Sequence, residues 1–288
     1  MTWFVQYLQC PDCSGELIFK KQVVCCNSCS FSREQVGRQF NLLPLIHSSY
    51  SIVFDRDGPS EREKTLSSIQ TERPEITYKG PPAQRDSSGL FSVLNQYLQE
   101  DSCLLDLGCG PRDQAIPADY LKYKYVGIDC SGESADILAD AHSIPFRDAT
   151  FNGILSFAVL EHLHNPFIAI REVERVLCAG GVFVGAVSQG EPFHNSFFHQ
   201  TPYGLLSLVR STPLLEIVRL WSSLDTLESL ARMGRYPRVL RSILQGLDIV
   251  HSNVPFLAPR RMMWSKEEKN IDSLFRAGSI CFVIKKRC

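Results

Sequence analysis

Short apolar runs alternate with amphipathic segments through the middle of the chain. Residues 104–107, 125–128, 151–157 and 179–184 are rich in apolar residues, and each run is short enough to be one buried strand. Between the last two runs, residues 166–177 carry apolar side chains at helical spacing. Alternation of strands and helices predicts a doubly wound, mostly parallel α/β sheet that binds ligands at the carboxyl ends of its strands.

The last third of the chain predicts two more strands with a helical insertion between them. Residues 215–220 are expected to form a sixth strand, and residues 279–286 a final, antiparallel one, which makes seven strands with a short one after Asp129. Within the insertion, about residues 222–270, Pro237 favours two short helices over one long helix. Its arginines at three-residue spacing are Arg232, Arg235, Arg238 and Arg241. They predict a basic face for a phosphate, nucleotide-sugar, lipid headgroup or RNA, or simply a solvated surface.

Composition divides the chain into three parts and indicates the compartment in which the protein works. Residues 1–46 form a small cysteine-rich module, residues 47–89 a linker rich in Ser, Pro, Gly and charge, and residues 90–288 the large domain. With a net charge of −1, the chain as a whole does not attract nucleic acid electrostatically. No signal peptide or membrane-length apolar run is apparent, and eleven cysteines with CxxC spacing suggest a reducing compartment. These features predict a cytoplasmic protein.

A tight glycine turn follows the first strand of the large domain. Asp106 and Leu107 lead into Gly108 and Gly110, and glycines here let the backbone turn sharply and approach a ligand closely. The next strand ends at Asp129, where a carboxylate can accept both hydroxyls of a ribose. The pattern therefore predicts a nucleoside-containing cofactor.

The order of the later motifs adds a resemblance to a known family. Residues 139–142 contain an Asp-Ala pair, residues 160–162 read Leu-Glu-His, and strand and helix patterns continue to residue 184. Over roughly residues 90–210 the chain resembles the class I S-adenosylmethionine-dependent methyltransferases. The resemblance implies a seven-stranded, mostly parallel sheet and S-adenosylmethionine as the cofactor.

The same resemblance assigns roles around that cofactor. It implies that Asp106, Gly108 and Gly110 lie beneath the methionine portion and that Asp129 holds the ribose. It places the adenine amino group at Asp140 and the backbone of Ala141, and the sulfonium between Phe157 and Ala158. The alternative for Asp140 is an ordinary helix N-cap or turn residue.

One departure from the family pattern concerns the adenine side. Only seven residues separate Asp129 from Ile137, which is too few for a crossover helix between parallel strands. We therefore expect a tight loop, a very short third strand and an open adenine face. Pro117 is expected to weaken the helix after the glycine turn.

Two CxxC pairs in the N-terminal module predict a metal site. Cys10 and Cys13 form the first pair and Cys26 and Cys29 the second, with a predicted hairpin between them at residues 17–24. Four thiolates around one point suit a structural Zn²⁺. Cys25 is an alternative partner for Cys29, and free cysteines without a metal are the other possibility. The segment resembles the zinc ribbons fused to or paired with some methyltransferases, including a ribosomal-RNA guanine methyltransferase.

Histidines gather in the part of the chain expected to surround the transferred methyl group. His162 follows the fourth strand, while His194 and His199 follow the fifth in a segment rich in aromatic residues. A base helps methylation of a hydroxyl, because the oxygen must lose its proton. The three histidines are therefore candidate catalytic residues, with structural hydrogen bonding as the alternative for each. This segment is similar to one in methyltransferases of glycan or polysaccharide assembly.

These observations lead to one favoured function and two alternatives. The favoured function is methyl transfer from S-adenosylmethionine to a small-molecule or carrier-linked glycan acceptor, with O-methylation preferred. The first alternative is a ribosomal-RNA or transfer-RNA methyltransferase that binds RNA through its zinc ribbon; nucleic acid is possible but not favoured as a partner. The second alternative is a non-enzymatic cofactor-binding or scaffold protein whose ribbon recruits a partner, which a cofactor cleft blocked by side chains would favour.

Overall fold

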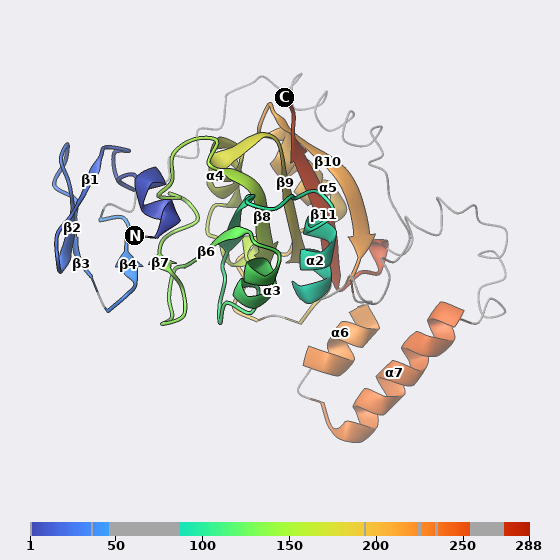
Figure 1. The fold of residues 1–288 in the computed structure, drawn as a ribbon. Coiled ribbons are helices and arrows are strands. Elements are labelled where there is room, and N and C mark those ends of the chain that lie inside the picture. Colours follow the sequence, from blue (N-terminus) through green and yellow to red (C-terminus); the bar gives the residue numbers. More distant parts are fainter. Residues whose placement is uncertain are drawn as a thin grey trace, which may run out of the picture.

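An eight-stranded sheet forms the centre of the protein (Figure 1). The computed structural model describes residues 2–35, 37–45, 87–192, 194–223, 226–233, 236–253 and 274–288. In spatial order the strands are β10 (Leu215–Ser222), β11 (Ser279–Lys286), β9 (Leu177–Ser188), β8 (Phe151–Phe157), β5 (Cys103–Leu107), β6 (Lys124–Asp129), β7 (Ile137–Leu138) and β4 (Phe40–Asn41). Strand β11 pairs antiparallel with β9 and β10, and the other pairs are parallel.

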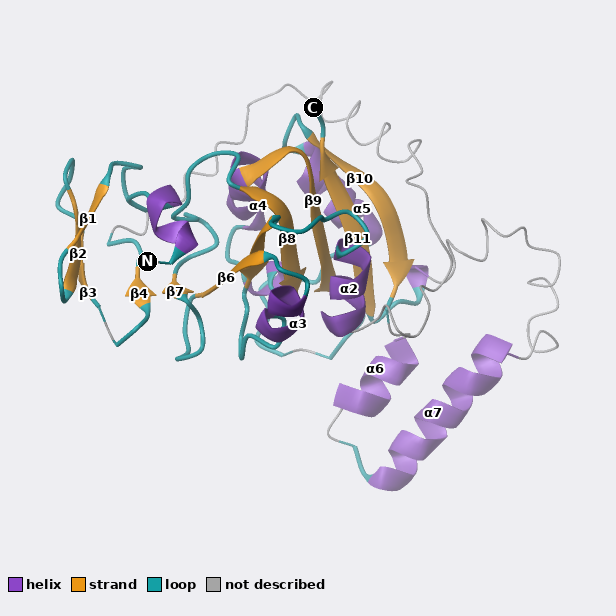
Figure 2. Ribbon diagram, in the orientation of Figure 1, coloured by secondary structure: helices purple, strands orange, loops and turns teal. Residues whose placement is uncertain are grey.

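Helices cover both faces of this sheet, as the alternating pattern predicts (Figure 2). They are α2 (Ser87–Leu94), α3 (Ala115–Tyr120), α4 (Pro166–Val176) and α5 (Pro202–Arg210). Residues of α2 and α3 share one hydrophobic core with Leu104 of β5, while residues of α4 and α5 share the other with Leu105. Neighbouring strand residues point to opposite faces, so each strand contributes to both cores. Helix α3 is only six residues long, in keeping with Pro117 inside it.

The eighth strand comes from the N-terminal segment and was not predicted. Phe40 and Asn41 pair in parallel with β7, and the N–H of Leu42 donates to the carbonyl of Leu138 at 2.8 Å. Strand β7 is very short, as expected from the seven-residue spacing, and would otherwise be an open edge. Residues 40–42 of the N-terminal module therefore belong to the main sheet.

The rest of the N-terminal segment is a small sheet packed against the large domain. A 3₁₀ helix, η1 (Trp3–Tyr7), precedes three antiparallel strands: β1 (Leu17–Phe19), β2 (Val23–Cys26) and β3 (Ser32–Glu34). The first two form the predicted hairpin, and β3 is an addition. Phe4 of η1 makes edge contacts with Phe40 and Phe146, so this segment and the large domain share one core. The predicted linker lies outside the described residues except for its last three, which begin α2.

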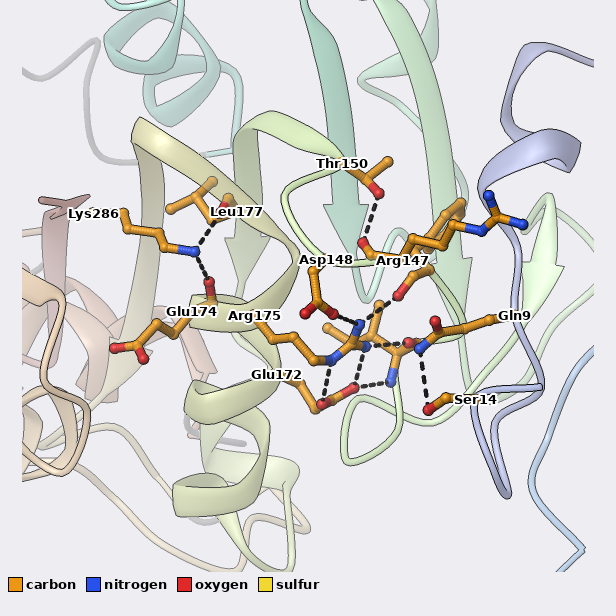
Figure 3. A network of polar contacts seen from close by, with 12 residues as sticks. Gln9, Ser14, Arg147, Asp148, Thr150, Glu172, Glu174, Arg175, Leu177 and Lys286 are labelled. Carbon is orange, nitrogen blue, oxygen red and sulfur yellow. Dashed lines mark hydrogen bonds and ion pairs between the residues drawn. The ribbon is translucent and has the colours of Figure 1, made fainter. Parts of the chain in front are cut away.

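A polar network fixes the loop between β7 and β8 (Figure 3). Arg175 of α4 donates to the carbonyls of Ile144 and Phe146 at 2.7 and 2.6 Å, and its guanidinium pairs with Glu172 and Asp148. Glu172 also accepts the N–H of Ile144 at 2.8 Å. The loop residues just after the Asp-Ala pair are thereby held to a core helix.

The predicted insertion begins with two helices, as Pro237 suggests. They are α6 (Thr226–Met233) and α7 (Arg238–Asn253), and they stand beside the sheet in Figure 1. Arg238 and Arg241 are exposed on α7, together with Val239, Ile243 and Leu247 at four-residue spacing. The described part of α7 thus presents apolar as well as basic side chains. Arg235 and the side chain of Arg232 lie outside the described residues.

Candidate cofactor and active site

The glycine turn after β5 is sterically demanding at one of its two glycines. Gly108 has φ +73°, and a Cβ on it would lie 2.3 Å from Cγ2 of Val159. Gly110 has φ +50°, but a Cβ there would meet nothing within 4 Å. Glycine is therefore favoured at residue 108 by both conformation and space, and at residue 110 by conformation alone.

Asp129, at the end of β6, is held against this turn. Its Oδ2 accepts the N–H of Gly110 at 3.0 Å, and its Oδ1 accepts the N–H of Ser131 at 3.1 Å. Both bonds orient the carboxylate without using all of its lone pairs, because an ionised carboxylate has about four acceptor sites. The side chain can therefore still accept hydrogen bonds from a ligand.

A cavity of about 260 Å³ opens at the carboxyl ends of these strands. It is just smaller than the roughly 300–1,000 Å³ range of small-molecule sites. The predicted site residues that line it are Gly108, Asp129, Asp140, Ala141, Ala158 and His162. Apolar walls from residues that the sequence did not single out complete it: Leu107, Ile128, Ala139, Val159 and Leu163, with Cys130 beside Asp129. Most of them lie at or just after strand ends, whereas Leu163 follows the Leu-Glu-His motif.

Asp106 does not line this cavity. Neighbouring strand residues face opposite ways, and its neighbour Leu107 faces the cavity. The Asp106 carboxylate instead accepts the hydroxyl of Tyr125 at 2.7 Å. Burial raises the pKa of Asp106 to about 6, although the Tyr125 hydroxyl and the charge of Arg112 act in the opposite direction. Asp106 therefore joins β5 to Tyr125 of β6.

Asp140 occupies a turn at the cavity wall. Its Oδ1 accepts the backbone N–H of His142 at 2.8 Å and lies 2.6 Å from Nδ1 of the same residue. His142 in turn accepts the N–H of Asn165 on Nε2 at 3.1 Å. The two possibilities for Asp140, turn residue and cofactor contact, are thus compatible in one side chain. His142 is a supporting residue that the sequence did not single out.

Of the two predicted residues at the end of β8, Ala158 lines the cavity and Phe157 does not. Ala158 lines the cavity with φ +55°, a left-handed conformation that is uncommon outside glycine. Phe157 is 41% exposed and does not line the cavity. Gly110 is likewise outside its lining.

The three candidate histidines lie in one group at the edge of the cavity. His162 lies on a 3₁₀ turn, η3 (Leu160–His162), and lines the cavity. Its ring centroid is 5.1 Å from that of His194, which is 5.7 Å from that of His199. Glu161, fully buried beneath them, was not among the sequence candidates. Only its place in the Leu-Glu-His motif could have indicated it.

The four predicted metal-ligating cysteines also come together. The Sγ atoms of Cys10 and Cys29 are 3.6 Å apart, as are those of Cys13 and Cys26, and all four lie within 4.8 Å of one another. A tetrahedral Zn²⁺ with Zn–S bonds of about 2.3 Å spaces its sulfurs roughly 3.8 Å apart. The Sγ of Cys25 is outside this group and lies 3.8 Å from the carbonyl of Ile18. The geometry favours Cys26.

The part of the chain that builds this cavity matches a known protein family. A family model described as a methyltransferase domain matches residues 105–185. The chain is 24% identical over 158 residues to the human mitochondrial arginine-hydroxylase NDUFAF5, covering 49% of this chain and 44% of that protein. It is 32% identical over 118 residues to the human protein named Probable tRNA methyltransferase 9B, covering 33% of this chain and 25% of that protein. Among solved structures, phosphoethanolamine N-methyltransferase 2 from Haemonchus contortus matches with 12% identity, a TM-score of 0.41, and 71% of this chain and 58% of that chain covered.

Residues 105–185 are therefore a methyltransferase domain, and the predicted class I methyltransferase fold is confirmed. The prediction of a methyltransferase is confirmed at the level of this domain. The chain spans less than half the length of the curated relatives that it matches. Within the described part of the chain, no helix has the length and apolar character needed to cross a membrane.

Proposed function

We propose that this chain transfers a methyl group from S-adenosylmethionine to a hydroxyl of a small molecule or carrier-linked glycan. The observation that carries the proposal is the cavity at the carboxyl ends of β5, β6 and β8, where two carboxylates, a glycine turn and a histidine meet. Bound S-adenosylmethionine supplies an electrophilic methyl group on its sulfonium.

The residues around the cavity fit that cofactor. A side chain at residue 108 would collide with Val159, and glycine avoids this collision. The backbone of the turn is therefore free to lie against the methionine portion. Asp129 would accept the ribose hydroxyls, and Asp140 with the backbone of Ala141 would receive the adenine amino group. The end of β8, at Phe157 and Ala158, would flank the sulfonium. These residues would align and desolvate the reacting atoms. Good positioning alone lowers the activation barrier by roughly 7–11 kcal/mol.

The acceptor would enter past the histidine group. His162 lines the cavity and has His194 next to it, so a base is available to take a hydroxyl proton as the new bond forms. The loop after β9 also exposes Phe197 and Phe198, with Tyr203 close by in sequence on α5. Exposed aromatic rings suit the apolar faces of sugars or carriers, which supports the glycan class of acceptor.

Methylation of transfer RNA or ribosomal RNA is the second candidate. One of the curated proteins similar to this chain is named as a tRNA methyltransferase. The N-terminal module contributes Lys20, Lys21 and Arg38 as exposed cations. Arg33 is engaged internally, because it donates to the carbonyls of Leu43 and Pro44 at 3.0 and 2.9 Å. This reduces the basic surface available to RNA.

The experiment that separates these acceptors uses the purified full chain and S-adenosylmethionine carrying a labelled methyl group. Small-molecule, glycan-lipid and RNA fractions are offered in parallel, and incorporation into each is counted. We expect label in the small-molecule or glycan fraction. Label confined to RNA, with activity that falls steeply as salt rises, would favour the second candidate. If calorimetry detects no heat on adding the cofactor, the proposed methyl transfer is wrong.

The cysteine group is proposed to hold one structural Zn²⁺ through Cys10, Cys13, Cys26 and Cys29. The N–H of Ser28 points at Sγ of Cys26 at 3.3 Å. Burial opposes ionisation of Cys26, yet that N–H and the neighbouring thiols lower its pKa to about 7, whereas burial raises the pKa of Cys10. Four thiolates leave no open coordination position, so the role is structural.

We predict that Cys13→Ser abolishes tight zinc binding in the N-terminal module, whereas Cys25→Ser does not. Cobalt replacing zinc reports on the sulfur ligands through its thiolate-to-cobalt charge-transfer absorption. This band should be lost or strongly reduced in Cys13→Ser and unchanged in Cys25→Ser. Equal loss in both variants would mean that the choice of Cys26 over Cys25 is wrong.

A further inference from the structure

Glu161, His162 and His194 bring one carboxylate and two imidazoles together beside the cofactor cavity. One ligand atom from each lies within 4.8 Å of the other two. Glu161 and His162 come from η3, and His194 comes from the loop after β9. We propose that these three residues bind a divalent transition-metal ion, separate from the cysteine site, at the acceptor side of the cavity.

The buried carboxylate of Glu161 lacks a full set of partners. The side chain is fully buried, and its Oε1 accepts the N–H and the hydroxyl of Ser188 at 3.3 and 2.7 Å. Its Oε2 has no hydrogen-bond partner among the described residues. A buried carboxylate oxygen without a partner is costly, so a site of this kind is suited to a cation.

Both imidazoles are held in a form that can ligate a metal. Nδ1 of His194 lies 2.8 Å from the carbonyl of Pro192, and Nδ1 of His162 lies 3.3 Å from the carbonyl of Asn195. A carbonyl only accepts, so each Nδ1 donates its proton, and in the neutral ring Nε2 keeps the lone pair. A backbone carbonyl on the second ring nitrogen is the usual support of a metal-ligating histidine. Nε2 of His194 lies 4.0 Å from Oε1 of Glu161.

The local charge also favours a cation. The hydroxyl of Ser188 lies 2.7 Å from Glu161, 2.6 Å from Glu191 and 3.4 Å from Nε2 of His194, yet it has only one proton to donate. Within the described ranges, no lysine or arginine forms an ion pair with either carboxylate. A divalent ion would balance the two negative charges.

The donor set indicates the kind of metal and its exposure. Two imidazoles and one carboxylate suit zinc, iron(II), cobalt or manganese better than calcium or magnesium. Metal–ligand bonds of about 2.0–2.2 Å require closer ligand atoms than those seen, so binding would draw the three side chains together. Three protein ligands leave positions open, and His162 faces the cavity. An acceptor oxygen bound there would lose its proton to solvent more easily, so with the metal bound His162 and His194 act as ligands and no longer as the base. This last role rests on the proposed methyltransferase function, whereas the metal site itself does not.

The test is a cobalt(II) titration of the full chain with zinc already bound in the cysteine site and with no S-adenosylmethionine present. We expect one cobalt ion per chain, with visible absorption but no thiolate-to-cobalt band. His194→Gln and Glu161→Gln should each weaken binding at least about 10-fold, since even outer supporting residues contribute 10- to 100-fold. His164→Gln, an exposed histidine two residues after His162, should leave binding unchanged.

Glu161→Gln alters a buried side chain, so far-ultraviolet circular dichroism is recorded for each variant, and His194→Gln decides the question if Glu161→Gln unfolds. The proposal is overturned if the unmodified chain takes up no second metal, or if cobalt binds His194→Gln as tightly. Because the cofactor is absent, failure of this titration says nothing about methyl transfer, and inactivity toward every acceptor leaves the metal site standing.

Discussion

Asp129→Ala is expected to weaken S-adenosylmethionine binding about 100-fold or more while the chain stays folded. Hydrogen bonds to a charged group contribute about 1.5–3 kcal/mol each, and two ribose hydroxyls would lose such a bond. A 100-fold loss corresponds to about 2.7 kcal/mol. The backbone N–H groups of Gly110 and Ser131 would also lose their acceptor, which loosens the turn that faces the cofactor. Calorimetric titration with S-adenosylmethionine measures the effect.

Asp113→Ala is the matched control for this experiment. Asp113 is an exposed carboxylate that follows the same glycine turn, and it does not line the cavity. Its removal alters the net charge equally but should change affinity by less than about 3-fold, because exposed charges that make no direct contact are screened. Unchanged affinity in Asp129→Ala would refute the ribose role.

Gly108→Ala is expected to destabilise the protein by about 2–5 kcal/mol, the sum of two costs. A left-handed conformation costs a non-glycine residue roughly 1–2 kcal/mol. Overpacking against Val159 adds about 1–3 kcal/mol. Gly110→Ala, with a similar φ but open space, should cost only about 1–2 kcal/mol. The free energy of unfolding in urea measures both.

The steric part of this prediction has its own test. Adding Val159→Ala to Gly108→Ala removes the methyl group that the new Cβ would strike at 2.3 Å. In a double-mutant cycle, the two changes should show a favourable coupling of about 1–3 kcal/mol. Additive effects would mean that the chain relieves the contact in another way, and that the strain at Gly108 is conformational only.

Features that follow from local patterns could be predicted from the sequence. The seven predicted strands of the central sheet, the glycine turn and Asp129 at the end of β6 appear where the spacing of apolar residues and glycines places them. The short third strand was predicted from the spacing between Asp129 and Ile137, because the seven residues between them are too few for a crossover helix. The CxxC pairs likewise bring four sulfurs together through short-range geometry.

Features that depend on contacts distant in sequence could not be predicted. The pattern of residues 40–44 is the same whether it closes a small module or pairs with β7, and only the open edge at β7 decides between them. Asp106 seemed a cofactor residue from its place before the glycine turn, yet its direction depends on which face of β5 meets the cavity.

By itself, the sequence determined the class of fold, the position of the glycine turn and the grouping of four cysteines, because each depends on residues close together in the chain. Only the tertiary structure decided how Glu161, His162 and His194 combine. Glu161 and His194 are separated by the whole of α4 and β9, and their approach depends on how β8 and β9 pair and on Ser188 at the end of β9. Spacing in sequence carries no information about a distance that a folded sheet imposes.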